Sequence, residues 1–129
     1  MNIKRIFSVL LLSTIISGCS NVSSSSVPAV SDNKKTKGVI YITQESLPEN
    51  IHYKVIGQVE ANARYGYEHV VTLYPMLAAE AKSIGANAII NTHGGHRVAL
   101  FSWAAPYTSG TAIKIDDIEL LKKYEGDFY

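Results

Sequence analysis

The sequence predicts a single α+β domain: a small, mainly antiparallel sheet of four to five strands, one principal helix packed on it and a short C-terminal helix. Residues 73–92 combine helical spacing of apolar side chains, a glycine and a short isoleucine-rich run, which is typical of a helix followed by a buried strand. β-branched and aromatic segments on both sides supply further strands. The chain of 129 residues has room for one such domain after its N-terminal segment. The expected order is strand, strand, helix, strand, strand, strand.

The first two strands are predicted before the helix. Residues 38–43 read Gly-Val-Ile-Tyr-Ile-Thr, and residues 52–61 alternate apolar and polar side chains. A turn is expected over residues 46–50, which contain Pro48. Gly57, in the middle of the second strand, indicates a bulge or a close approach by another backbone. Residues 62–67 are expected to be an irregular loop.

The principal helix is predicted from one apolar stripe. Its members recur at spacings of four, four and three: Leu73, Leu77, Ala81 and Ile84. Pro75 suits a first helical turn, and Gly85 is placed to end the helix in a left-handed conformation. The apolar run over residues 86–90 then predicts a buried strand on which the helix packs.

A two-residue hairpin is expected next, because Gly94-Gly95 can adopt the positive φ angles of such turns. In that hairpin His93 faces His96, and residues 97–103 run back as a strand whose two faces are both apolar away from the turn. A loop over residues 104–110 and a strand over 111–115 follow. Asp116 is the expected N-cap of a helix over residues 117–124, and this helix or a partner subunit would cover the second face of the sheet.

The N-terminus has the build of a secretory signal. Lys4 and Arg5 precede an apolar run over residues 6–16 that is too short for a relaxed bilayer span, and small residues follow. Ile16-Ser17-Gly18-Cys19 resembles the lipobox of bacterial lipoproteins. That resemblance implies a signal peptide over residues 1–18 and a Cys19 that carries an N-acyl group and an S-diacylglycerol group. An ordinary cleaved signal and a lone membrane anchor are the alternatives.

Lipidation of Cys19 determines where the protein is expected to be located in the cell. Several acyl chains make a durable anchor, so the protein would be tethered to a membrane. An aspartate directly after the lipidated cysteine resembles an inner-membrane retention signal in enteric bacteria, but this chain has Ser20 at that position. In a host with two membranes, the expected location is therefore the periplasmic face of the outer membrane. Residues 19–37 are predicted to be the lipidated cysteine and a flexible linker with a reach of about 60 Å, and residues 38–129 the single domain.

Charge and cysteine content exclude several classes of function. The formal net charge is +1, and loss of Lys4 and Arg5 with the signal lowers it to about −1, so the protein has no long-range attraction for nucleic acid. Three further lysines, at positions 34, 35 and 37, lie in a polar stretch that is typical of solvated chain. The single cysteine, Cys19, excludes an internal disulfide, a multi-thiolate zinc site and a thiol nucleophile in the folded part.

The order of elements resembles a group of small bacterial domains that includes the YbjQ-like "heavy-metal-binding" family and the RcsF-like lipoproteins. The resemblance covers residues 38–115, and its specific part is Ala79 to Ile90, a helix that runs into Gly-Ala-Asn-Ala-Ile-Ile. It implies the fold and carries no chemistry. RcsF-like sensing depends on disulfides that this chain cannot form, and no ligand set of the metal-labelled family transfers. The YbjQ-like relatives form rings, which implies self-association.

Two candidate sites follow from the residues. In the expected hairpin, His93 and His96 share a face and could hold two corners of a transition metal, with a third ligand from His52, His69 or Glu60. The alternative is that they are polar residues at a hairpin end. Aromatic residues in or beside loops could form a partner surface or could close the ends of the core; they are Tyr65, Tyr67, Tyr74, Trp103 and Tyr107.

No catalytic signature is present: the serines lack a nucleophile elbow, and no phosphate-cradling loop or His-Glu-x-x-His helix occurs. The sequence therefore predicts a non-enzymatic, outer-membrane-anchored lipoprotein that acts as an interaction or envelope-maintenance and sensing module. Its expected partners are envelope proteins or further copies of itself. The alternative is a periplasmic protein that binds a metal or a small ligand at the His93/His96 hairpin.

Overall fold

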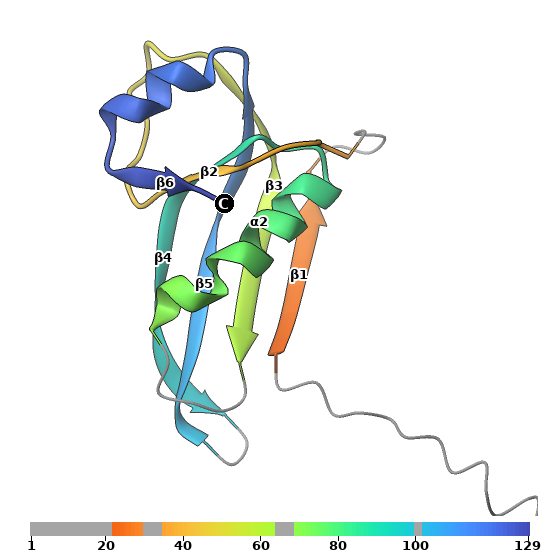
Figure 1. Ribbon diagram of the computed structural model, residues 1–129, viewed down its shortest axis with the longest axis vertical. Coiled ribbons are helices and arrows are strands. Elements are labelled where there is room, and N and C mark those ends of the chain that lie inside the picture. Colours follow the sequence, from red (N-terminus) through yellow and green to blue (C-terminus); the bar gives the residue numbers. More distant parts are fainter. Residues whose placement is uncertain (1–21, 30–34, 64–68, 100–101) are drawn as a thin grey trace, which may run out of the picture.

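The fold was established from a computed structural model that describes residues 22–29, 35–63, 69–99 and 102–129. Within these residues, six strands form one mixed sheet in the order β1-β3-β5-β4-β2-β6 (Figure 1). The strands are β1 (Val22–Pro28), β2 (Tyr41–Thr43), β3 (Tyr53–Ala63), β4 (Ala88–Ala99), β5 (Ser102–Ile115) and β6 (Gly126–Phe128). Only β2 and β4 pair in parallel; the other neighbours are antiparallel. The α+β class is confirmed, whereas the number and order of strands differ from the prediction.

One α-helix packs on the sheet. It is α2 (Tyr74–Ser83), preceded by the 3-10 helix η1 (Val70–Leu73), and it lies across one face of the sheet (Figure 1). All four residues of the predicted stripe are buried. Pro75 lies in the first turn, and Gly85 has a φ of 89°, so both predicted helix boundaries are confirmed.

The sheet is covered on both faces at one end, where β2, the start of β4 and the end of β5 lie together. Under α2, the core contains Ile42, Val59, Leu77 and Ile89. On the opposite face, a second cluster contains Ile90, Ile113 and Ile115, covered by Leu121 of the 3-10 helix η2 (Ile118–Lys123), which is fully buried. The chain itself thus supplies the second layer at this end of the sheet, as predicted for its C-terminal helix. Asp117, not Asp116, is the N-cap, since its carboxylate accepts a hydrogen bond from the Glu119 N–H.

The N-terminal segment differs from the prediction. Residues 20–37 were expected to be a flexible tether, but Val22–Pro28 forms β1 and pairs with β3 from Ala63 to Gly57. Ser24 Oγ also donates to Glu80 Oε1 on α2 at 2.5 Å. A serine-rich run buries little apolar surface, but an edge strand is held mainly by backbone hydrogen bonds, which composition does not report.

The predicted hairpin at Gly94-Gly95 is wrong. β4 runs straight through both glycines, and β5 runs beside it through the residues predicted to be a loop, 104–110. Neither glycine has a positive φ. A side chain at Gly94 would collide with the Tyr107 backbone oxygen and with Val70 on η1, so this glycine provides space for close packing and not a turn.

Among the described residues, the long strands pair with three register shifts, the last of which lies between Arg97 and Ala99 of β4. The predicted irregularity at Gly57 is confirmed in both senses, because the β3 register shifts between Val55 and Gly57 and the Val27 backbone approaches closely. β4 shifts register between Ile90 and His93, where Asn91 takes a φ of 51°. Asparagine tolerates this left-handed conformation, and an extra residue there re-aims the side chains that follow.

Candidate functional site

The two histidines of the predicted metal site do not face each other. His93 lies opposite Ser109 of β5 and His96 opposite Pro106. They are three residues apart on one regular stretch of strand, so their side chains project from opposite faces of the sheet. The two-corner geometry expected at a hairpin turn is therefore wrong, because that turn does not exist.

His93 makes polar contacts with neighbouring groups of the sheet. Its Nε2 lies 3.0 Å from Ser109 Oγ and its Nδ1 lies 3.1 Å from the Asn91 backbone oxygen. Glu60, one of the expected third ligands, instead pairs with Arg97 at 2.8 Å. Among the described residues, no group of three or more histidine, cysteine, aspartate or glutamate side chains is arranged to hold a metal ion.

The predicted aromatic surface is described only in part. Tyr65 and Tyr67 lie outside the described residues, as does the side chain of Trp103. Cys19, the predicted lipidation site, also lies outside them. Tyr107 is half-buried on β5, and the Arg97 guanidinium carbon stands 4.9 Å from its ring centroid.

These residues form a polar row on one sheet face, made of Glu60, Arg97 and Tyr107. Arg97 connects the other two members, through its ion pair with Glu60 and its contact with the Tyr107 ring. A stacked arginine with a half-buried tyrosine is an arrangement common at protein interfaces.

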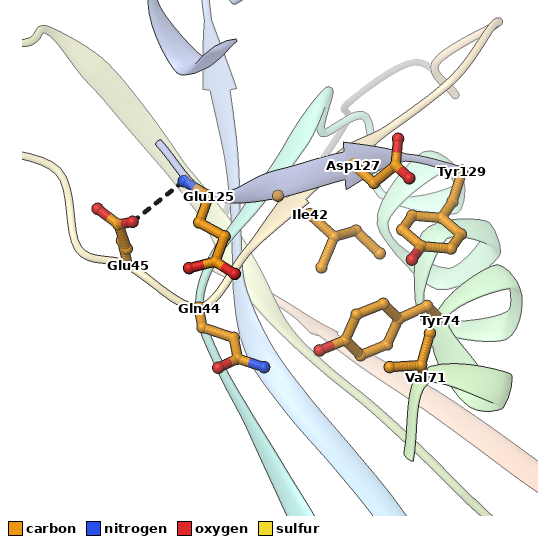
Figure 2. Close-up of a pocket in the computed structure, with 9 residues that line it drawn as sticks. Ile42, Gln44, Glu45, Val71, Tyr74, Glu125, Asp127 and Tyr129 are labelled. Atoms are coloured by element: carbon orange, nitrogen blue, oxygen red, sulfur yellow. Dashed lines mark hydrogen bonds between the residues drawn. The ribbon is translucent and has the colours of Figure 1, made fainter. Parts of the chain in front are cut away.

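A cavity of about 380 Å³ opens at the other end of the sheet, beside β6, and the sequence did not predict it. It is lined by residues from β2 and the turn after it, from η1 and α2, and from the C-terminal segment (Figure 2). The lining residues are Ile42, Gln44, Glu45, Val71, Tyr74, Glu125, Gly126, Asp127 and Tyr129.

Backbone pairing positions the C-terminal side of the cavity. β6 pairs with β2, so Asp127 lies opposite Ile42, and the ladder continues beyond β6 with Tyr129 N donating to Ile40 O at 2.9 Å. Glu125 is fixed at its backbone: its N–H donates to Glu45 Oε1 at 3.0 Å, and its carbonyl oxygen accepts from Thr43 Oγ1 at 2.5 Å. The Glu125 carboxylate is thereby left to the solvent side of the cavity.

Two tyrosines form the opposite wall. The rings of Tyr74 and Tyr129 meet edge to face, with centroids 5.3 Å apart and planes at 87°. Figure 2 shows the Tyr74 hydroxyl pointing across the cavity towards Gln44 and Glu125. Burial, together with the negative charge of Asp127 and the neighbouring Tyr74, raises the pKa of the Tyr129 hydroxyl above its ordinary value of 10.0, so it stays protonated at neutral pH.

The cavity residues carried one weak signal in the sequence. Glu125, Asp127 and Tyr129 are two residues apart, which places them on one side of an extended segment. Nothing local indicated that this side faces Ile42 and Tyr74, which come from distant parts of the chain.

Comparison with protein-family models, with curated protein sequences and with solved structures finds no match to this chain. In the described part of the chain, none of the helices has the length and apolar character needed to cross a bilayer.

Proposed function

We propose that the protein is a bacterial lipoprotein of the YbjQ-like/RcsF-like kind, held at the periplasmic face of the outer membrane by lipid on Cys19. The observation that carries this proposal is the order of features in the first 19 residues. Lys4 and Arg5 are followed by a short apolar run and by Ile16-Ser17-Gly18-Cys19. Lipidation would also explain why the single cysteine of the chain stands at this position.

The position of β1 limits how far the domain could lie from a lipid on Cys19. β1 begins at Val22, three residues after Cys19, so the extended link between lipid and sheet spans only about 10 Å. The long flexible reach expected from residues 20–37 is lost once residues 22–28 pair with β3. A lipid on Cys19 would hold the β1 edge close to the membrane surface.

We further propose that the domain works as a non-enzymatic interaction or envelope-maintenance module. The support is the polar row on the exposed sheet face, where Arg97 and Tyr107 present a cation and a half-buried ring side by side. One argument for self-association was an apolar sheet face without cover. In the folded chain, η2 packs on that face, so this argument for a second subunit no longer applies.

Lipidation is tested by mass spectrometry of the N-terminus and by membrane fractionation of cells that express the protein. The expected result is an acylated cysteine and recovery in the outer membrane. Cys19→Ala should abolish both, whereas Ser20→Asp should keep the lipid and move the protein to the inner membrane of an enteric host. An unmodified thiol in the wild type would overturn the proposal.

The interaction role is tested by crosslinking in intact cells, followed by purification of the crosslinked species. Arg97→Ala should remove a specific crosslinked partner. Lys54→Ala, which removes an exposed positive charge near the start of β3 and outside the polar row, is the matched control and should leave the partner in place. Identical crosslinking patterns for both variants and the wild type would rule out the polar row as the contact surface.

A further inference from the structure

We propose that the β4–β5 tip, which comprises residues 97–99 of β4 and 102–105 of β5, contacts the lipid surface that holds Cys19. This inference rests on the lipidation of Cys19 proposed above, and it adds an orientation of the domain on the membrane. It follows from the register of the strands, the short link to the lipid and the chemistry of the tip.

The register of the sheet places the start of β1 and the β4–β5 tip at the same end. Ser23 of β1 pairs with Asn62 of β3. Asn62 pairs with Tyr107 of β5, which pairs in turn with Gly95 of β4. Because β1 begins at Val22, one residue before Ser23, its start is level with position 96 of β4.

Both strands of the tip extend beyond that level (Figure 1). β4 continues from position 96 to Ala99, which pairs with Ser102 of β5. These further residues of strand span about 10 Å. Of the described strands, β4 and β5 therefore project furthest at the end of the sheet from which the chain leads to Cys19.

The link to the lipid keeps this end of the sheet at the membrane. Cys19 precedes Val22 by three residues, so its Cα lies within about 10 Å of the start of β1. The tip reaches a similar distance beyond the start of β1, and it lies only two or three strand spacings, about 10–14 Å, to the side. With the strands upright on the membrane, the tip lies at the depth of the lipid headgroups.

The chemistry of the tip suits this position. Val98 is 68% exposed, and an apolar side chain at this place gains by entering the headgroup layer. Residues 96–106 contain no acidic residue, so no carboxylate there is repelled by anionic lipid. Arg97 already pairs with Glu60, so apolar contact, and not a strong positive charge, makes this surface suitable for lipid.

Lipid has more support as the occupant than a second copy of the chain. A lipid on Cys19 keeps the membrane beside the tip in every molecule, so the contact is intramolecular and has a high effective concentration. A second copy has to reach the tip by diffusion in the plane of the membrane.

The test measures depth in the bilayer with a fluorescent label. Cys19 is the only cysteine in the chain, so Val98→Cys gives the lipidated protein a single free thiol for labelling. The full chain is expressed in a host that processes lipoproteins and is reconstituted in phosphatidylethanolamine–phosphatidylglycerol vesicles whose acyl chains carry a quencher. Val55→Cys is the matched control, because Val55 is a valine with 44% exposure on β3, near the opposite end of the sheet.

We expect the quencher to reduce the fluorescence of the label at position 98 and to leave that at position 55 unchanged, at every ratio of protein to lipid. Equal losses at both positions, or no loss at either, would overturn the proposal. Shielding of position 98 that requires a high protein density and shows no lipid quenching would identify a second copy as the occupant and would equally overturn it. An unmodified Cys19 in the mass spectrum would overturn the lipidation as well, so the two failures are distinguishable.

A label-free measurement excludes an effect of the dye itself. Trp103 is the only tryptophan of the chain and follows Ser102 on β5. The same quencher should reduce its fluorescence in the unsubstituted protein. Val98→Asp should diminish this quenching, because a charged side chain is costly in the bilayer and is repelled by phosphatidylglycerol, whereas Val55→Asp should leave it unchanged. Equal quenching in the three proteins would show that Val98 does not contact lipid, and would contradict the proposal.

Discussion

Asn87 provides the sharpest test of how the helix-to-strand segment stabilises the fold. Its side chain mimics a neighbouring strand: Nδ2 donates to the Ile115 backbone oxygen at 2.6 Å, and Oδ1 accepts from the Ile115 N–H at 2.9 Å. Asn87→Ala removes both hydrogen bonds and leaves two backbone groups of Ile115, a buried residue, without these partners.

The size of the effect follows from these two bonds. At about 0.5–1.5 kcal/mol each, their loss should lower the free energy of unfolding by about 1–3 kcal/mol. For a domain of this size, each kcal/mol corresponds to a fall in Tm of about 4–8 °C. Urea denaturation followed by circular dichroism measures the change, and an unaltered m-value would show that the unfolding transition is otherwise the same.

Two further variants make the test specific. Asn50→Ala removes an exposed asparagine without a hydrogen bond among the described residues, and it should change the free energy of unfolding by less than about 0.5 kcal/mol. Asn87→Asp keeps the acceptor but replaces the donor with a carboxylate oxygen beside the Ile115 carbonyl. This repulsion raises the pKa of the introduced carboxyl in the folded state, so the lost stability should return as the pH falls through that pKa.

A loss of less than about 0.5 kcal/mol for Asn87→Ala, the range of ordinary surface substitutions, would refute this account of the segment. A destabilisation by Asn87→Asp that is independent of pH would show that the side-chain amide does not donate to Ile115.

Two other predictions test the corrected strand and the buried tyrosine. Gly94→Ala should cost about 1–3 kcal/mol because its side chain would meet the Tyr107 backbone, whereas Gly95→Ala, which meets only the Tyr107 ring at 3.5 Å, should be nearly neutral in thermal unfolding. Strong destabilisation by Gly95→Ala would contradict the continuous strand and would support the predicted hairpin turn. Burial, then Asp127 and Glu45, raise the pKa of Tyr41 above 10.0, so its contribution to stability is present below about pH 10 and is lost as the pH rises through the folded-state value. Tyr41→Phe, which also loses the 2.6 Å bond to the Tyr124 carbonyl, should be less stable at pH 8 but lose less stability towards pH 11 in urea denaturation; a wild type and variant with equal alkaline slopes would contradict this.

The candidate sites depend on residues that are far apart in the sequence, which local sequence patterns do not bring together. Tyr74 belonged to the predicted aromatic set, yet its role in the cavity depends on Glu125 and Tyr129, which lie some fifty residues further along the chain. The predicted metal site at His93 and His96 is wrong because it depends on a turn at Gly94-Gly95, where β4 in fact continues. A glycine that permits a positive φ and a glycine that makes room for a backbone have the same appearance in a sequence.

The sequence by itself determined the helix from its apolar stripe, the helix end at Gly85, the bulge at Gly57 and the need for cover on both faces of the sheet. Each of these depends on neighbours within a few residues, where spacing and backbone preference decide the outcome. Only the tertiary structure decided that residues 22–28 form an edge strand, that β4 continues through Gly94-Gly95, and that Glu125 and Asp127 close a cavity against Tyr74. Strand pairing is made by backbone groups that every residue carries, so which segments pair is set by how the whole chain packs, not by their composition.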